Sequence, residues 1–472
     1  MHVGGSSMSR VDTGLGDVMY RQEHSGWREL WLKEDWWAIW LGLVIVAIAY
    51  LLFTNGSSLR WLAVTPAKWS SPDQLAAHFA NNGTRYLAQF IAWTAILSVA
   101  MAALGYRVRD FIAAFVLLYV LSVGIFALGQ WDKAVTYNLE PPLVALAIGL
   151  LIANTSGLPH WLDAGFRVEF YIKLGIILLG ATLPFTLILW AGPVAIIQAS
   201  IVSVVTFSVI YFVATRLQLD RRLAATLGVG GAVCGVSAAI AVASAVGARR
   251  EHAPIAITMV IGWAIVMIFV LPLVSRALGL PAGVGGAWIG SSEFADAAGF
   301  AAAQAYGDLA AQGAVAGTAD QAVHAFTLMK VVGRDVWIGI WAFVLAIVAT
   351  TRWEHAEGAP APHLTQIWWR FPKFVLGFLV TSMFVTWVTS GYSLADFNKL
   401  ANPGLVAPIK DLRTWAFIFC FLSIGLTTRF RELAKAGTKP FVAFTSGVAV
   451  NVVLGFVLSA FVFAAHWSAL GR

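Results

Sequence analysis

Long apolar runs recur along nearly the whole chain, and they constrain its fold more than any other feature. Each run of roughly 17 to 25 residues is long enough to cross the ~30 Å hydrocarbon core of a bilayer as a helix. The sequence is 59% hydrophobic and only 12% charged, which is about half the charge of an average soluble domain. These runs predict an all-α polytopic membrane protein that contacts the lipid bilayer along most of its length.

The runs divide the chain into a short polar start and one large membrane domain. Residues 1–35 predict a cytoplasmic or interfacial segment, and 36–466 predict the transmembrane domain. Two segments, 223–247 and 281–307, are apolar but rich in glycine, which weakens a helix. We expect discontinuous or re-entrant helices there, and 11–13 transmembrane segments in all. The uninterrupted spans are expected at about 36–53, 86–105, 111–131, 142–157, 168–184, 194–215, 255–276, 324–350, 372–390, 412–428 and 440–465.

Basic residues predict which loops face the cytoplasm. They gather in alternate loops, as in Arg107 with Arg109 and Arg221 with Arg222, which indicates a multi-pass inner-membrane protein with a cytoplasmic N-terminus. Arg249 fits this scheme only if 223–247 enters the membrane and returns, so we favour the re-entrant form. Because the basic residues flank apolar spans, the net charge of +7 does not indicate nucleic-acid binding. Cys234 and Cys420 lie inside apolar runs, so neither a disulfide framework nor a cysteine-based metal site is expected.

An internal repeat is visible in two glycine-containing segments. Gly180, Thr182 and Phe185 recur at the same spacing as Gly425, Thr427 and Phe430, and an Ala-Gly pair follows each set. The loop after the first set has no basic residue and the loop after the second has four, so the two copies are expected in opposite orientations. We place the copies at about 141–217 and 372–466. Inverted repeats of this kind build alternating-access transporters.

Ionisable residues inside the spans are candidates for function, since charge within a bilayer is unfavourable. Lys330 and Arg334 share one helical face and are able to hold an anion, with Asp335 beside them; snorkelling cations at a helix start are the alternative. Glu293 and Asp296, together with Asp335, are candidates for carrying a coupling ion, unless Glu293 and Asp296 are simply solvated at a surface.

The glycine-rich segment 223–247 is a candidate for binding an oxyanion through backbone N–H groups and a half-helix N-terminus. Gly235 and Ser237 are the expected donors there, although close helix packing explains four glycines equally well. Thr182 and Thr427, the equivalent threonines of the two repeat copies, are further candidates for binding the same anion. Asn154 either lines the same crevice or caps its helix.

Four of these segments carry a resemblance to a known family. VCGVSAA at 233–239, GLLIANT at 149–155, LGIILLGAT at 174–182 and GLTTRFRELAKAGTKP at 425–440 resemble the YeiH-like family of sulfate exporters. The likeness covers roughly residues 140–465, and that family looks related to cation/proton antiporters and bile-acid symporters. The resemblance implies an inverted-repeat transporter fold with crossing discontinuous helices. The SSEFADAAG segment departs from the family pattern because it lacks the expected histidine.

These observations together favour a secondary active transporter of a small anion, such as sulfate, sulfite or a small organic acid, driven by H⁺ or Na⁺. A cation/proton antiporter is the alternative, and a membrane receptor or scaffold is a third reading. No Walker A, HExxH or GxSxG pattern is present, so we expect neither an enzyme nor a bound cofactor. The sequence leaves open whether the chain forms a homodimer.

Overall fold

Helices account for almost all of the structure. The computed structural model describes residues 29–134, 141–155, 158–249, 251–353, 372–393, 396–433 and 437–471. These residues contain no β-strand, only one isolated bridge between Trp69 and Trp131. Seven helices among them are long and apolar enough to cross a membrane. The chain is therefore an all-α polytopic membrane protein, as predicted, while the expected 11–13 crossings stay a prediction.

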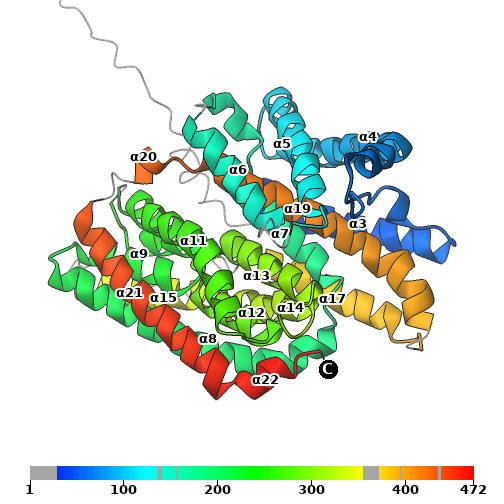
Figure 1. Cartoon of the computed structure of the whole chain (residues 1–472). Helices are drawn as coiled ribbons and strands as arrows, with labels where there is room; N and C mark the ends of the chain where they lie inside the picture. Colours follow the sequence, from blue (N-terminus) through cyan, green and yellow to red (C-terminus); the bar gives the residue numbers. More distant parts are fainter. Residues whose placement is uncertain are drawn as a thin grey trace, which may run out of the picture.

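The helices carry the labels of Figure 1 from here on. In chain order they are α2 (Glu29–Leu32), α3 (Glu34–Thr54), η2 (Leu59–Trp61), α4 (Pro72–Ala103), α5 (Val108–Gly129), α6 (Pro141–Thr155), η3 (His160–Ala164), α7 (Val168–Gly180), α8 (Phe185–Arg216), α9 (Arg221–Ala232), α10 (Val236–Ala245), α11 (His252–Ala277), α12 (Ala282–Ser292), α13 (Asp296–Ala311), α14 (Ala319–Thr327), η4 (Leu328–Arg334), α15 (Trp337–Val348), η5 (Ala349–Trp353), α17 (Phe374–Thr389), η6 (Phe397–Val406), α19 (Ala407–Thr427), α20 (Phe430–Leu433), α21 (Thr438–Val457), η8 (Leu458–Val462) and α22 (Ala464–Ser468).

The first glycine-rich segment is a re-entrant hairpin. Its arms, α9 and α10, have 12 and 10 residues, so each covers only about half of the ~30 Å hydrocarbon core. Arg222, at the start of α9, donates a hydrogen bond of 2.8 Å to the carbonyl oxygen of Gly247, just beyond the end of α10. Both ends of the hairpin therefore lie at the same face of the protein, which is the form that the position of Arg249 favoured.

The second glycine-rich segment is also a hairpin, and it enters from the opposite face. Its arms are α12 and α13, and its ends meet where Tyr306 Oη donates to Leu280 O over 2.5 Å and Ala282 N donates to Ala316 O over 2.8 Å. A single long helix, α11, connects the two hairpins and carries the chain from one face to the other. Figure 1 shows α12, α13 and α14 beside α11, with α8 and α21 along the outside.

The two predicted repeat copies contact each other through their first two helices. Helices α6 and α19 cross so closely that a Cβ on Gly149 would lie 2.8 Å from Gly425 Cα. Helices α7 and α17 make the matching contact, where Thr381 Oγ1 donates to Ile177 O over 2.7 Å. In both contacts the first helix of one copy packs against the second helix of the other copy. A two-fold relation between inverted copies requires this pattern. The boundaries of the copies stay a prediction.

Hydrogen bonds at the helix ends repeat this relation. Asn154 Nδ2 of α6 donates to Thr428 O beyond α19, and Ser382 Oγ of α17 donates to Leu183 O beyond α7, over 3.0 and 2.5 Å. The amide of Phe430, the counterpart of Phe185 in the repeat, donates to Asn154 Oδ1 over 2.9 Å. Equivalent loops in the two copies are thus held by polar side chains of the other copy.

The N-terminal helices α3, α4 and α5 lie at one end of the molecule (Figure 1). Lys173, on α7, forms an ion pair of 2.8 Å with Asp35 of α3, and Arg167 pairs with Glu34. A carboxylate on a neighbouring helix thus holds the ammonium group of Lys173. The predicted segment 1–35 lies outside the described residues up to position 28.

The crossing of α6 and α19 gives a test of this packing. We expect Gly149→Ala to lower the thermal unfolding midpoint in detergent, because the added Cβ meets the backbone of α19 and overpacking costs about 1–3 kcal/mol. Gly262→Ala on α11 is the matched control, since nothing lies within 4 Å of a Cβ at that position. Equal midpoints for the two variants would contradict the close crossing.

Candidate functional site

The two hairpins touch at their tips. Gly235, between α9 and α10, has φ = +77°, a conformation that L side chains rarely adopt. A Cβ at this position would collide with the carbonyl oxygen of Phe294, which lies between α12 and α13. Glycine is therefore required twice over, by its backbone angle and by the approach of the second hairpin. The helix is therefore interrupted where the glycines predicted a break, and binding of an oxyanion by Gly235 stays a prediction.

The first arm of each hairpin ends at these tips and leaves carbonyl groups without partners in its own helix. Lys330 and Arg334, both fully buried on the π-helical turn η4, supply the missing donors. Lys330 Nζ donates to Val233 O of the first hairpin and to Glu293 O of the second, each over 2.9 Å.

Arg334 also bridges the two hairpins, and it reaches carbonyl groups that lie earlier in the first arm of each hairpin. Its Nη2 donates to Gly231 O over 3.2 Å, and its Nη1 donates to Ser291 O over 2.8 Å and Glu293 O over 3.0 Å. Gly231 precedes Val233 by two residues, just as Ser291 precedes Glu293. Each cation therefore joins equivalent carbonyls of the two hairpins, and its charge lies at the negative ends of two helix dipoles.

Three carboxyl groups surround these cations. Asp296, in the first turn of α13, places Oδ1 3.7 Å from Lys330 Nζ, and its acidic side chain suits a helix N-terminus. Glu293 Oε1 accepts hydrogen bonds from the amides of Phe294 and Ala295 over 3.0 and 3.4 Å. Within the described residues, Glu293 Oε2 and both carboxylate oxygens of the buried Asp335 have no hydrogen-bond partner. The tips thus hold buried acceptors that a proton or a cation is able to satisfy.

One group of atoms at the tips also has the spacing of metal ligands. One ligand atom each from Cys234, Asp296 and Asp335 lies within 4.8 Å of the others. Lys330 stands beside the same carboxylates, and its positive charge opposes a divalent cation there. The set therefore fits a proton or a monovalent ion better than a resident metal.

The structure brings six of the ten predicted site residues to the tips: Gly235, Lys330, Arg334, Glu293, Asp296 and Asp335. Ser237 follows in the first turn of α10 and is half-buried. Lys330 and Arg334 were predicted to bind the substrate, and their donors bind carbonyl groups instead.

The other three predicted residues have different surroundings. Thr182 Oγ1 accepts a hydrogen bond of 3.0 Å from Arg413 Nη1, Thr427 Oγ1 donates to Ser423 O over 2.7 Å, and Asn154 bonds Thr428. Inversion explains this, because the equivalent ends of α7 and α19 lie at opposite faces and not at the middle. The expectation of one site containing all three is corrected accordingly.

Arg413 is a residue that the sequence reasoning missed. It lies on α19, is 1% exposed, and has an Nε with no hydrogen-bond partner among the described residues. The available signal was a single arginine within the apolar run of α19. Nearby, Lys410 of α19 forms an ion pair of 2.8 Å with Asp320 of α14, which links the helices of the repeat copies to those that carry the hairpins.

Comparison with known proteins places this architecture in a family. The family model described as "Conserved hypothetical protein 698" matches residues 112–444, well over half of the chain. The chain belongs to this family. A UPF0324 membrane protein of Rhodopirellula baltica is 32% identical over 419 residues, which cover 87% of this chain and 73% of the relative.

Other relatives of the family carry the same description. A UPF0324 membrane protein of Nitratidesulfovibrio vulgaris is 32% identical over 375 residues, 78% of this chain and 62% of the relative. One from Nitrosomonas europaea is 27% identical over 442 residues, 86% of this chain and 90% of the relative. No solved structure matches the chain. The resemblance to the YeiH-like family is consistent with these relatives, and their descriptions name a membrane protein without a substrate.

The bridging role of Lys330 gives a second test. We expect Lys330→Met to lower the thermal unfolding midpoint in detergent, because Val233 O loses the donor from Lys330, while Glu293 O keeps only the one from Arg334 Nη1. A buried group that is left unsatisfied costs about 1–3 kcal/mol. Lys410→Met is the control, since it removes an ion pair that is partly exposed. A Lys330 variant as stable as the Lys410 variant would contradict the bridge.

Proposed function

We propose that the chain is a secondary active transporter of a small anion, coupled to H⁺ or Na⁺ and working by alternating access. The observation that carries this proposal is the contact of two half-membrane hairpins, entering from opposite faces, at a buried cluster of charges. Discontinuous helices of this kind form substrate and ion sites near the midplane of transporters. A protein with only a structural or scaffold role has no need for such irregular backbone in the membrane.

The second arms of the hairpins supply the features that suit an anion. Helices α10 and α13 begin at the tips, so their first N–H groups and positive dipole ends point to the middle of the protein. Ser237 adds a hydroxyl group in the first turn of α10, and it is not fully buried. A small oxyanion such as sulfate or sulfite, or the acid group of a small organic acid, fits these donors. Lys330 and Arg334 offset part of the negative charge of the carboxyl groups around them.

The carboxyl groups supply the coupling. Asp296 and Asp335 lie close enough that their charges repel, so binding one H⁺ or Na⁺ between them stabilises the pair. The buried Glu293 carboxyl group is a second acceptor, because its Oε2 has no hydrogen-bond partner among the described residues. Loading of this cation makes the site more favourable for an anion, which couples the two fluxes. In this proposal the chain resides in the inner membrane with a cytoplasmic N-terminus and catalyses no reaction.

A cation/proton antiporter is the second candidate, and one observation favours it. Lys330 Nζ and both Nη atoms of Arg334 donate to carbonyl groups, whereas both oxygens of Asp335 lack a hydrogen-bond partner within the described part of the chain. A site in which most of the cationic donors are occupied and a carboxylate is available suits a cation. Flux measurements with both kinds of ion separate the two candidates.

The test uses purified protein in sealed liposomes with an imposed pH or Na⁺ gradient. We expect gradient-driven uptake of labelled sulfate, sulfite or a small organic acid. Asp296→Asn and Asp335→Asn should each lower that uptake by about tenfold or more, because the coupling site loses a charge that binds the cation. Asp73→Asn, at an exposed position at the start of α4, is the control and should transport normally.

Three outcomes would change the assignment. Exchange of Na⁺ or K⁺ for H⁺, with no anion flux, would select the antiporter. Anion uptake that is unchanged in both aspartate variants would remove these residues from the coupling site. No flux of any ion in vesicles that hold folded protein would overturn the transporter proposal.

A further inference from the structure

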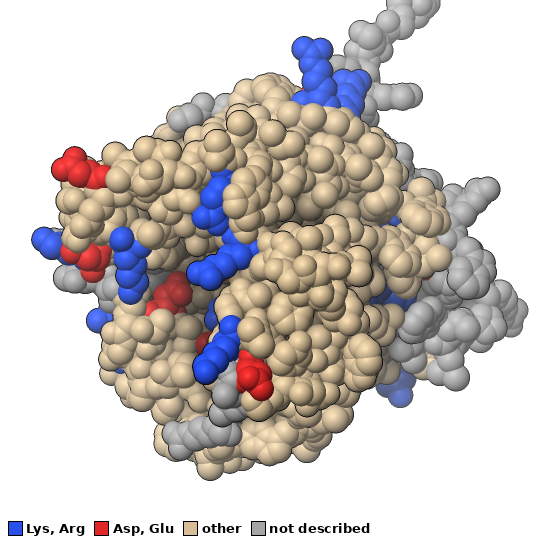
Figure 2. Space-filling view, turned by 90° about the vertical axis from the view of Figure 1, so that its right-hand side faces the viewer, with Lys and Arg blue, Asp and Glu red and all other residues tan. Residues whose placement is uncertain are grey.

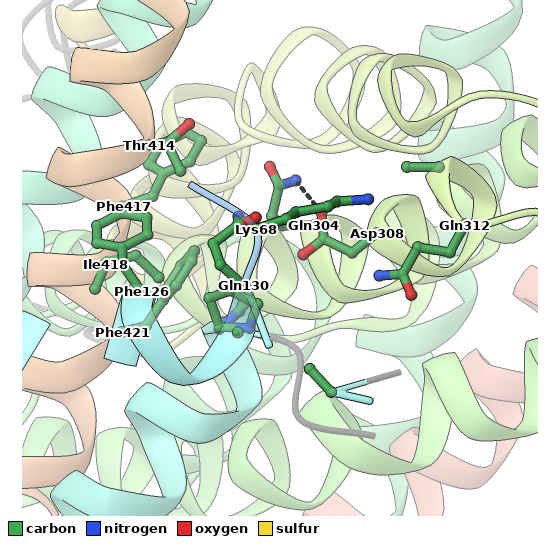
Figure 3. A pocket seen from close by; sticks show the side chains of 15 residues that line it. Lys68, Phe126, Gln130, Gln304, Asp308, Gln312, Thr414, Phe417, Ile418 and Phe421 are labelled. Carbon is green, nitrogen blue, oxygen red and sulfur yellow. Dashed lines mark hydrogen bonds between the residues drawn. The ribbon is translucent and has the colours of Figure 1, made fainter. Parts of the chain in front are cut away.

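A groove of about 170 Å³ lies between the N-terminal helices and α19, away from the hairpin tips. This volume is well above the about 10–15 Å³ that holds one water. A larger cavity of about 210 Å³, beside α13, is lined in part by polar side chains such as Gln130 and Gln304 (Figure 3). The walls of the groove are instead almost entirely apolar, and they include Ile45 and Ile48 of α3, Leu59 of η2, Ala92 and Ile96 of α4, and Leu412 of α19.

The lining of the groove has few polar atoms, and they come from Gln89 and Trp93. Gln89 Nε2 donates to Val64 O over 3.2 Å, and Gln89 Oε1 accepts a hydrogen bond of 2.9 Å from Tyr119 Oη. Trp93 adds an indole N–H that has no hydrogen-bond partner among the described residues. The groove therefore offers mainly apolar contact, which suits a hydrocarbon chain and not a small anion.

The groove opens beside side chains that face lipid. Ile48 is 44% exposed, and Val44 and Leu51, which share its side of α3, are exposed as well. On α4, Leu87 and Ile91 are also exposed. Figure 2 looks onto the right-hand side of Figure 1, where α3 and α4 lie, and shows broad uncharged areas around the charged side chains. Lipid chains therefore have direct access to the groove.

The groove also has the depth of one lipid leaflet. Ile45 lies nine residues before the end of α3 at Thr54, and Ile96 lies 11 residues after Arg85 of α4. At 1.5 Å per residue these two positions are about 14–16 Å below the ends of the apolar segments. Half of the ~30 Å hydrocarbon core has the same thickness. A single acyl chain fits this depth.

Two arginines stand where the groove meets the membrane surface. Arg85 Nη2 donates to Arg60 O over 2.8 Å, and its Nε donates to Trp61 O over 2.9 Å. Its guanidinium thus lies against η2, the turn whose Leu59 lines the groove. Arg60 is exposed, and neither arginine forms an ion pair within the described residues. Both positive charges are therefore available to a phosphate group.

One carboxylate lies close enough to act on this pair. Asp411, the neighbour of Leu412 on α19, interacts electrostatically with Arg60, and also with Lys410 and Arg413. Three cations thus share its charge. A guanidinium also has more N–H groups than the three that Arg85 uses in the described structure. The mouth of the groove consequently favours an anionic headgroup over one that carries an additional cation.

We propose that this groove holds one acyl chain of an anionic phospholipid, with the lipid phosphate at Arg60 and Arg85. Anionic lipids are attracted to basic residues at the membrane surface, and the chain buries apolar area in the groove. Helices α3 and α4 end before residue 112, where the match to the family model begins, so most of the site lies outside that match. The inference goes beyond the proposed function and does not depend on it.

Binding is tested on the whole purified protein, delipidated in detergent and titrated with dioleoyl phosphatidylglycerol or dioleoyl phosphatidylcholine. We expect phosphatidylglycerol to raise the thermal unfolding midpoint more than phosphatidylcholine, because the two share acyl chains and differ in headgroup charge. Arg60→Gln should weaken phosphatidylglycerol binding by about fivefold. Ala92→Phe should abolish it, since the added ring occupies the groove. The controls are Arg109→Gln and Ala95→Phe, two exposed positions that do not line the groove.

Each outcome bears on the lipid site alone. Equal effects of the two lipids, or phosphatidylglycerol binding unchanged in both Arg60→Gln and Ala92→Phe, would overturn the site. Glycerol 3-phosphate, which has no acyl chain, would overturn it too if it stabilised the protein as much as the lipid does. If Ala92→Phe does not fold, the comparison of Arg60→Gln with Arg109→Gln decides, and equal affinities reject the proposal. Ion flux in liposomes, present or absent, tests only the transporter proposal.

Discussion

Backbone carbonyl groups inside a bilayer need hydrogen-bond donors, and the two hairpin tips depend on Lys330 and Arg334 for theirs. A re-entrant hairpin must break its helix near the midplane, where no water is available to satisfy the exposed groups. Lys330 and Arg334, two cations on one neighbouring turn, donate hydrogen bonds to equivalent carbonyl groups of both hairpins and so satisfy them. The charge of these cations in turn makes it favourable to place carboxylates beside them, which gives the tips their ionisable cluster.

The rest of the structure holds this arrangement in place. Helix α11 separates the entry faces of the hairpins, while α8 and α21 flank them (Figure 1). The first two helices of each repeat copy, α6 with α7 and α17 with α19, form a second group that crosses at Gly149 and Gly425, with loops held by Asn154 and Ser382. Contacts between the two groups include the partly exposed pair of Lys410 and Asp320. A polar, partly exposed contact of this kind is easier to break than a packed core, which suits movement of one group against the other.

The membrane-spanning helices and the two interrupted segments were predictable from the sequence, because hydropathy indicates which segments cross a bilayer and clustered glycines indicate where a helix is interrupted. The pattern around Gly235 predicted a break, and the charge of Arg249 favoured a return to the same face. Spacing along a helix also brought Lys330 and Arg334 together. Their bonds to carbonyl groups were not predictable, since backbone partners leave no trace in side-chain patterns. Thr182 was misplaced for a related reason: a repeat shows which residues are equivalent, but not how far apart inversion puts them.

Sided chemical labelling at Ser237 tests the central claim that the hairpin tips open alternately to the two faces. Cys234 and Cys420, both buried, are first replaced by Ala, and Ser237→Cys is added. A membrane-impermeant thiol reagent is then applied to right-side-out and to inside-out vesicles that retain flux. The account predicts labelling from both sides, slowed by the transported substrate. Labelling from one side only, or from neither side while flux persists, would contradict it.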